Sequence, residues 1–171
     1  RDSLYADPEG VAFFVRNLSK NYEGVPPILQ RFGTISFHGE VSGYFTDIVT
    51  YGLVHTDIGS IKTDLKISSD KEKGYFAYSG AVKTEELELG NMLDNEKLGK
   101  VTFNLDVEGS HYDNQYPSIV MKGLIASIDY SDYNYENITL DGKYKQGGFN
   151  GKVALDDENG SIPVSYTHLT L

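Results

Sequence analysis

The chain has no cysteine and no tryptophan, and only five of its 171 residues are proline. Without cysteine it has no disulfide framework, no thiolate metal ligand and no thiol nucleophile. Basic residues are also few: fifteen Lys and Arg stand against twenty-five Asp and Glu, which gives a formal net charge of −10. A field of that sign repels phosphate backbones, so nucleic acid is not an expected partner.

Long apolar runs are missing as well, since none approaches the roughly 20 residues that a membrane-spanning helix requires. The first residues, Arg1-Asp2-Ser3, are neither an initiator methionine nor a signal peptide, so we expect a fragment of a longer protein. Residues 161–171 depart from the acidic, glycine-punctuated composition before them, and their string PVSYTHLTL resembles translated adapter sequence. We therefore expect 161–171 to be a non-native tail.

The chain is rich in Tyr, Phe and Gly, with thirteen, eight and eighteen of them, a composition typical of β-rich proteins with many tight turns. Apolar and polar residues alternate with period 2 at 60–67 and, most cleanly, at 100–109. We expect about eight strands in residues 33–160, without βαβ crossovers. The predicted fold class is all-β, a largely antiparallel meander. Residues 119–129 carry two competing apolar parities, which a β-bulge would reconcile.

Helical patterns are confined to two places. Residues 1–32 predict a helical lead-in, capped by Asp7, with Pro8 in the first helical position and an end at Gly24. An apolar stripe at i, i+3, i+4 and i+7 would place this helix on an edge or end of the sheet. The stripe consists of Val11, Phe14, Val15 and Leu18. A second short helical turn contains Leu89, Met92 and Leu93 and is expected to end at Gly99.

The sequence contains no recognisable catalytic, metal-binding or nucleotide-binding motif. The four histidines, at 38, 55, 111 and 168, have no metal-ligand spacing, and the chain has no G-x-S-x-G elbow, P-loop or Rossmann glycine pattern. We therefore expect no catalytic residue, no metal and no cofactor, and an enzyme is the least favoured class.

The strands share one property, which is that their apolar residues fall on one side. Little is left over to cover that side, so either the sheet folds onto itself or its concave face stays available. The first case would be a closed β-sandwich or adhesin-like module that binds glycan or protein, with Tyr130, Tyr133 and Tyr135 as candidate contacts. The second would be an open apolar surface.

Several segments resemble the long TamB proteins of the AsmA-like group. The resemblance covers residues 8 to about 160 and depends on the succession of short segments rather than on any one of them. These segments are F-x-G-x-V-x-G at 37–43, T-D-x-G at 56–59, L-G-K-V at 98–101 and G-x-F-N-G-K-V at 147–153. None of them has catalytic meaning.

The resemblance implies a taco-like or tubular β-sheet with a hydrophobic interior. Proteins of this group are anchored in the inner membrane of Gram-negative bacteria and cross the periplasm. They meet an Omp85-type partner in the outer membrane and are implicated in phospholipid transport and outer-membrane protein assembly. This chain would be an internal periplasmic segment, and the contact with the Omp85-type partner would belong to the parent protein.

The resemblance and the one-sided strands together predict a groove that holds phospholipid acyl chains. The predicted lining is Ile35, Phe37, Ile61, Leu65, Phe76, Val101, Phe103, Leu105, Val107, Ile138, Leu140, Phe149 and Val153.

Overall fold

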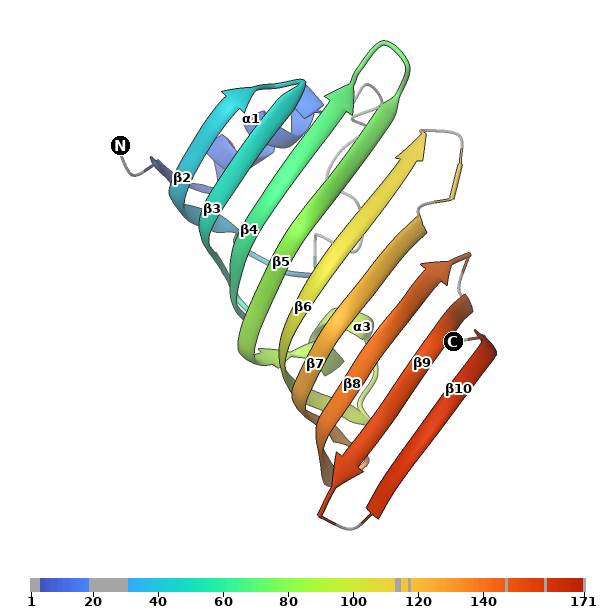
Figure 1. Cartoon of the computed structure of the whole chain (residues 1–171). Coiled ribbons are helices and arrows are strands. Elements are labelled where there is room, and N and C mark those ends of the chain that lie inside the picture. Colours follow the sequence, from blue (N-terminus) through green and yellow to red (C-terminus); the bar gives the residue numbers. More distant parts are fainter. Residues whose placement is uncertain are drawn as a thin grey trace.

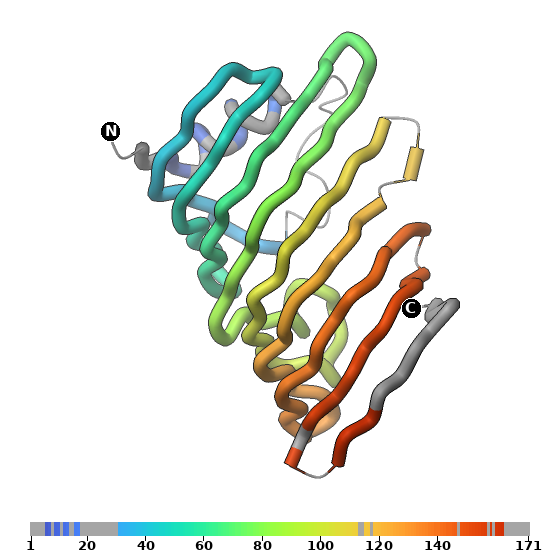
Figure 2. The backbone as a smooth tube through the Cα atoms, in the orientation of Figure 1, coloured from blue at the N-terminus to red at the C-terminus, as the bar shows by residue number. Residues whose placement is uncertain are grey.

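The described part of the chain forms a single antiparallel sheet of ten strands that follow one another in chain order (Figure 1). The structure is a computed structural model and describes residues 4–18, 31–112, 115–116, 118–146, 148–158 and 160–170. Each described strand pairs with its neighbours in sequence, and the tube view shows the strands side by side from the N-terminal to the C-terminal end (Figure 2). The prediction of an all-β antiparallel meander is confirmed.

The strands are long, up to 15 residues in β6. Their bounds are β1 Leu4–Ala6, β2 Ser36–Tyr44, β3 Asp47–Thr56, β4 Gly59–Asp70, β5 Tyr75–Glu88, β6 Leu98–Tyr112, β7 Ser118–Tyr130, β8 Tyr133–Lys145, β9 Gly148–Asp157 and β10 Gly160–Thr170. The described residues also form two helices, α1 at Pro8–Leu18 and α3 at Leu89–Leu93.

The eight strands expected in residues 33–160 correspond to β2 to β9. The predicted last hairpin has the expected register, with Ile138 opposite Leu155 and Tyr144 opposite Phe149. The expected lead-in at 1–32 is not purely helical, because Leu4–Ala6 forms β1 and pairs with Phe37–Gly39 of β2. A strand of three residues is too short to produce a recognisable alternation.

The segment expected to be a tail, 161–171, also takes part in the sheet. The backbone of residues 160–170 forms β10, which pairs with β9 through a register shift between Tyr166 and Leu169. An exposed edge strand offers unpaired backbone groups to any extended segment. The pairing is therefore a property of the β9 edge and says nothing of where the string originates.

The bulge that would reconcile the two parities in residues 119–129 lies at Ala126. On β6, Thr102 and Phe103 are consecutive, but their partners on β7 are Ser127 and Ile125, so Ala126 is the additional residue. The bulge turns both Ile125 and Ile128 to the side of the sheet that carries Val101 and Phe103. The prediction of a bulge is confirmed, and it explains why neither parity alone fits this strand.

Both expected helices are present in the described part of the chain. In α1 the backbone N–H of Gly10 donates to Oδ1 of Asp7 at 2.9 Å, which confirms the predicted cap. The described part of this helix runs to Leu18, and the end expected at Gly24 lies outside the described residues. The side chains of its predicted apolar stripe and residues 19–30 lie outside the described part of the chain, so its docking stays a prediction.

In α3, the left-handed conformation of Asp94 (φ 54°, ψ 46°) ends the helix, and not Gly99, which lies in β6. Aspartate tolerates this conformation because its short side chain bonds locally. Of the three residues that predicted this turn, Leu89 and Met92 pack against the core cluster, whereas Leu93 is 45% exposed.

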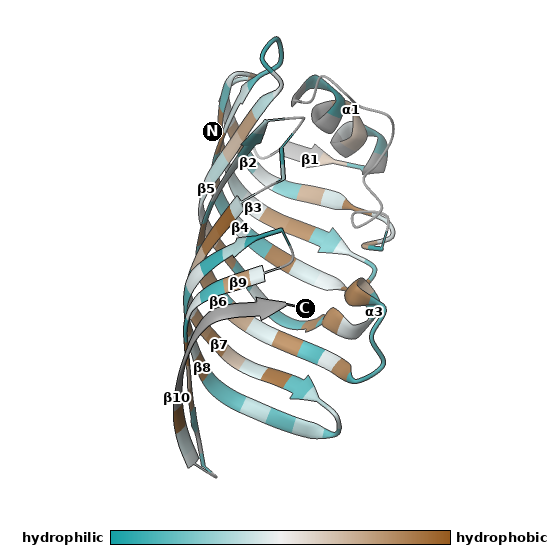
Figure 3. Cartoon of the chain, turned by 90° about the vertical axis from the view of Figure 1, so that its right-hand side faces the viewer, coloured by the Kyte–Doolittle hydropathy of each residue, from teal (hydrophilic) through white to brown (hydrophobic). Residues whose placement is uncertain are grey.

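The sheet is curved, and both helices lie on its concave side (Figure 3). Three of the buried apolar residues, Ile58, Leu87 and Val101, form a core cluster beside α3. Around it pack Phe32 and the α3 side chains Leu89 and Met92, together with sheet residues that include Phe103. The face that carries Val101 and Phe103 is therefore the concave face, and the face that carries their neighbours Lys100 and Thr102 is the convex face.

Aromatic rings on the concave face lie over glycines of adjacent strands. A Cβ placed on Gly109 would overlap the ring of Tyr78, and one placed on Gly142 would overlap the ring of Phe149. The Phe149 side chain is only 7% exposed. Tyr78 is partly buried as well, and this burial raises the pKa of its hydroxyl. Such ring-over-glycine pairs fix the register of a curved sheet and cover its backbone.

Candidate functional site

The concave face contains the residues that the sequence predicts as a lipid-binding surface. Cross-strand pairing from β2 to β9 places all of them on this one face except Ile35, which precedes β2. For example, Leu105 of β6 lies opposite Gly123 of β7, which lies opposite Leu140 of β8. Strict alternation in long strands makes this outcome predictable, because the side-chain period is 2.

The concave face carries no formal charge where β2 to β9 are paired. No Asp, Glu, Lys or Arg of these paired stretches lies on it. The convex face carries the charges instead, for instance in the paired row of Asp64, Ala81, Asp106, Lys122 and Asp141. The two faces therefore differ sharply in what they can bind.

One row of side chains, all apolar except for one threonine, crosses the concave face from strand to strand. Consecutive pairs join β3 to β9 in a single line that runs across the strand direction. The row is Val54, Ile61, Thr84, Phe103, Ile125, Ile138 and Leu155. Six strand spacings of about 4.8 Å make this row about 29 Å long.

The threonines on the concave face do not interrupt its apolar character. The Oγ1 of Thr84 donates to the carbonyl oxygen of Ser60 at 2.7 Å, and those of Thr50 and Thr63 donate to Leu65 and Gly52, each at 3.4 Å. Each hydroxyl is thus bonded to the backbone of an adjacent strand. A buried hydroxyl that has its hydrogen bond within the sheet does not need a polar ligand.

Burial on the concave face is incomplete. Of the predicted residues, Val101, Leu105 and Phe149 are buried, at 3%, 8% and 7% exposure, whereas the others are partly exposed. The described residues supply no second sheet above this face. Of the helices, α1 lies beside β1 and β2, and α3 lies beside β6, where β5 and β6 are joined (Figure 3). The face is therefore an apolar surface that the described part of the chain covers only in part.

Sequence reasoning missed several residues of the row. In β3 the string Tyr51-Gly52-Leu53-Val54 is apolar on both parities, so nothing in it identifies Val54 as the concave residue. Ile125 was missed because the position of the bulge in β7 was not known. The cross-strand partners of these residues, Ile61 and Phe103, were predicted, and pairing with them is the signal that locates the missing positions.

The histidines do not form a site together. His38 and His55 lie on the convex face, and His55 Nδ1 is 3.0 Å from the Ser60 hydroxyl. His111 lies on the concave face beside Phe76, and its Nδ1 is buried without a hydrogen-bond partner among the described residues. Within the described ranges, no three His, Asp or Glu side chains come close enough to hold a metal ion.

The three tyrosines considered as a binding cluster lie where β7 turns into β8. Tyr130 and Tyr133 are cross-strand partners, and the rings of Tyr133 and Tyr135 meet edge to face with centroids 4.6 Å apart. This packing is the ordinary arrangement of aromatic residues in paired strands. It gives no separate argument for ligand binding.

No family model matches this chain, and neither a curated protein nor a solved structure is significantly similar to it. None of the helices in the described ranges has the length and apolar character needed to cross a membrane.

Proposed function

We propose that the concave face binds phospholipid acyl chains, and that this chain is a segment of a periplasm-spanning TamB/AsmA-like protein. The observation that carries the proposal is the uncharged concave face with its continuous apolar row from Val54 to Leu155. Sequence resemblance supports the family, and the open, curved sheet agrees with it.

Apolar side chains along the row would replace water around a hydrocarbon chain. Each buried methylene is worth about 0.8 kcal/mol, so a chain of ten or more methylenes along the row gains several kcal/mol. A zwitterionic or anionic headgroup would lose far more than this if it were desolvated against an uncharged surface. The headgroup therefore stays in water at the open side while the acyl chain lies on the sheet.

In this proposal, the role in the cell belongs to the longer parent protein. A series of such segments would carry phospholipid between the inner and outer membranes and assist outer-membrane protein assembly. The membrane anchor and the contact with an Omp85-type partner would lie elsewhere in the parent. The segment itself acts as a passive surface in the periplasm and catalyses no reaction.

A closed β-sandwich that binds glycan or protein was the alternative from the sequence. A sandwich buries the apolar faces of two sheets against each other. The described residues form one sheet, and most of the predicted concave residues remain partly exposed. An open surface that binds acyl chains therefore explains the apolar side chains better than a closed sandwich does.

Site-specific photocrosslinking in cells tests the proposal. A photoreactive residue at Phe103, on the concave face, is expected to label phospholipid in the parent protein. The same residue at Thr102, its convex neighbour, is expected not to. Mass spectrometry of the adducts gives the comparison, and equal labelling at the two positions, or none at either, would refute acyl-chain binding.

A charge on the concave face should prevent this labelling. Leu140→Asp is expected to reduce lipid adducts at Phe103 at least tenfold, because an unpaired carboxylate near an acyl chain is costly to desolvate. Thr139→Asp places the same charge on the convex face of the same strand and is the matched control. Circular dichroism must show that both variants retain the sheet. Undiminished labelling in a folded Leu140→Asp protein would contradict the proposed path.

A further inference from the structure

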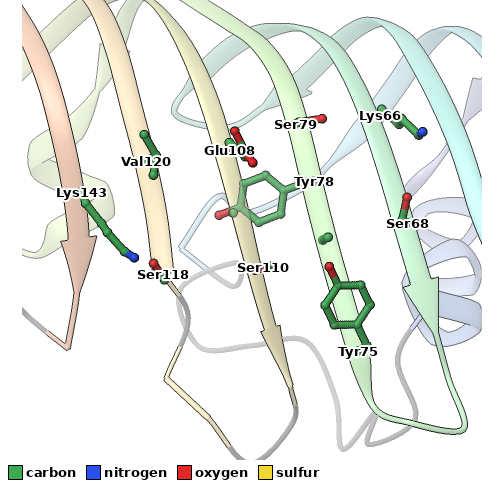
Figure 4. A pocket seen from close by; sticks show the side chains of 12 residues that line it. Lys66, Ser68, Tyr75, Tyr78, Ser79, Glu108, Ser110, Ser118, Val120 and Lys143 are labelled. Carbon is green, nitrogen blue, oxygen red and sulfur yellow. The ribbon is translucent and has the colours of Figure 1, made fainter.

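The convex face has a hollow of about 400 Å³, and none of the features discussed above accounts for it. It crosses β4 to β8 on the side opposite the helices (Figure 4). Its floor is a row of small residues, in which Ser68, Ala77, Ser110 and Ser118 are paired in register from β4 to β7.

Taller side chains border the floor on both sides. The neighbouring paired row contains Lys66 on β4, Glu108 on β6 and Lys143 on β8, and the ring of Tyr75 stands at the other border. The rings of Tyr75 and Tyr112 support each other, with centroids 5.1 Å apart. The difference in side-chain length between a row of Ser and Ala and rows of Lys, Glu and Tyr produces the hollow.

Several polar groups of the hollow have no partner among the described residues. Ser68 donates to Oδ1 of Asp47 at 2.8 Å, but no described residue accepts from or donates to the hydroxyls of Ser110 and Ser118. In the same described ranges, neither Lys66 nor Lys143 is within salt-bridge distance of a carboxylate. These groups are therefore available to a ligand.

The geometry excludes the simplest ligands. Lys66 and Lys143 lie four strands apart, about 19 Å, which is too far for both to contact one phosphate or carboxylate. The strands of the hollow are internal to the sheet, so their backbone groups are used in the ladders and cannot pair with a peptide strand. A ligand must therefore be extended, lie across the strands and be recognised by side chains.

We infer that this hollow binds an acidic oligosaccharide of several sugar units. Sugar hydroxyls match the free serine hydroxyls and the Glu108 carboxylate, and the apolar face of a sugar ring matches the Tyr75 ring. The two lysines outnumber the one glutamate at the hollow, on a chain whose net charge is −10, and they match carboxylates near the two ends of the ligand. This site is independent of the acyl-chain proposal, because it lies on the opposite face.

Isothermal titration calorimetry of the full chain with tetragalacturonate tests the inference. The acidic tetrasaccharide is expected to bind more tightly than maltotetraose, a neutral tetrasaccharide. The double variant K66Q/K143Q should weaken tetragalacturonate binding at least about tenfold, the worth of one charge-assisted hydrogen bond. The control K62Q/K152Q removes the same charge from the same face outside the hollow and should change the affinity less than twofold.

A second pair of variants tests the floor without changing charge. Ser110→Leu fills the hollow and should abolish binding, whereas Asn104→Leu, on the same strand and face but outside the hollow, should not. If circular dichroism shows that Ser110→Leu does not fold, the comparison of K66Q/K143Q with K62Q/K152Q tests the inference alone. No binding of tetragalacturonate at millimolar concentration, equal loss in the two lysine double variants, or binding by a folded Ser110→Leu protein would each overturn the inference.

Discussion

Replacement of Leu87 by alanine is expected to lower the free energy of unfolding by about 2–5 kcal/mol. Leu87 is only 2% exposed and belongs to the core cluster with Ile58 and Val101. Few apolar side chains of the described residues are buried at all. The loss of one of them therefore removes a large part of the packing that holds the α3 end together.

Leu93→Ala is the matched control, since Leu93 is in the adjoining helix α3 but is 45% exposed. It should change the free energy of unfolding by less than about 0.5 kcal/mol. Urea denaturation followed by circular dichroism measures both variants. Similar losses for the two would mean that the cluster does not anchor this end of the sheet.

The importance of Leu87 could not be read from the sequence. Residues 85–93, EELELGNML, look like a change from strand to helix, yet β5 continues to Glu88. A bulge lies between Thr84, opposite Phe103, and Leu87, opposite Val101. Glu86 within this bulge has a φ of 53°, and its N–H bonds to the Thr102 hydroxyl at 3.0 Å. The additional residue turns Leu87 onto the concave face.

The parts of the fold that alternation encodes were predictable. The parity of β6 alone fixes which of its side chains share a face, and cross-strand pairing then extends that face from β2 to β9. The short strand β1 was not predictable, because its three residues carry no period and their partners are more than thirty positions away. β10 was not predicted, because residues 161–171 differ in composition from the rest of the chain, whereas the strand pairs with β9 through its backbone.

The two candidate sites also differ in how far the sequence predicts them. The apolar concave face was largely predicted, since a repeated one-sided pattern is visible in each strand. The hollow on the convex face was not, because it arises from four small residues on four strands that only the register brings into one row. Serine and alanine at separate positions in the sequence look like ordinary solvent-facing strand residues.

Gly80→Ala is expected to be nearly as destabilising as the loss of Leu87, for a backbone reason. Gly80 lies inside β5 with a φ of +140°, a conformation that residues with a Cβ rarely adopt. Holding alanine there costs about 1–3 kcal/mol. A Cβ would also overlap the backbone carbonyl oxygen of Asp64 on β4, so the ladder between β4 and β5 must shift as well.

Gly160→Ala separates the two contributions. Gly160 has a similar φ of +151°, but a Cβ there would have no heavy atom within 4 Å. This control incurs only the dihedral cost, so Gly80→Ala should lower the free energy of unfolding by at least about 1 kcal/mol more. Gly123→Ala, with a φ of +149° and an overlap with the Asn104 carbonyl oxygen, should behave like Gly80→Ala.

Denaturant melts of the three alanine variants provide the comparison. Glycines inside strands mark bends and close approaches of neighbouring backbones, and Gly80 and Gly123 lie on the concave face of the curved sheet. If the close approach at these two positions holds the curvature, both variants must be less stable than Gly160→Ala. Equal stability of all three would show that only the dihedral matters, and that the curvature of the concave face does not depend on a missing Cβ.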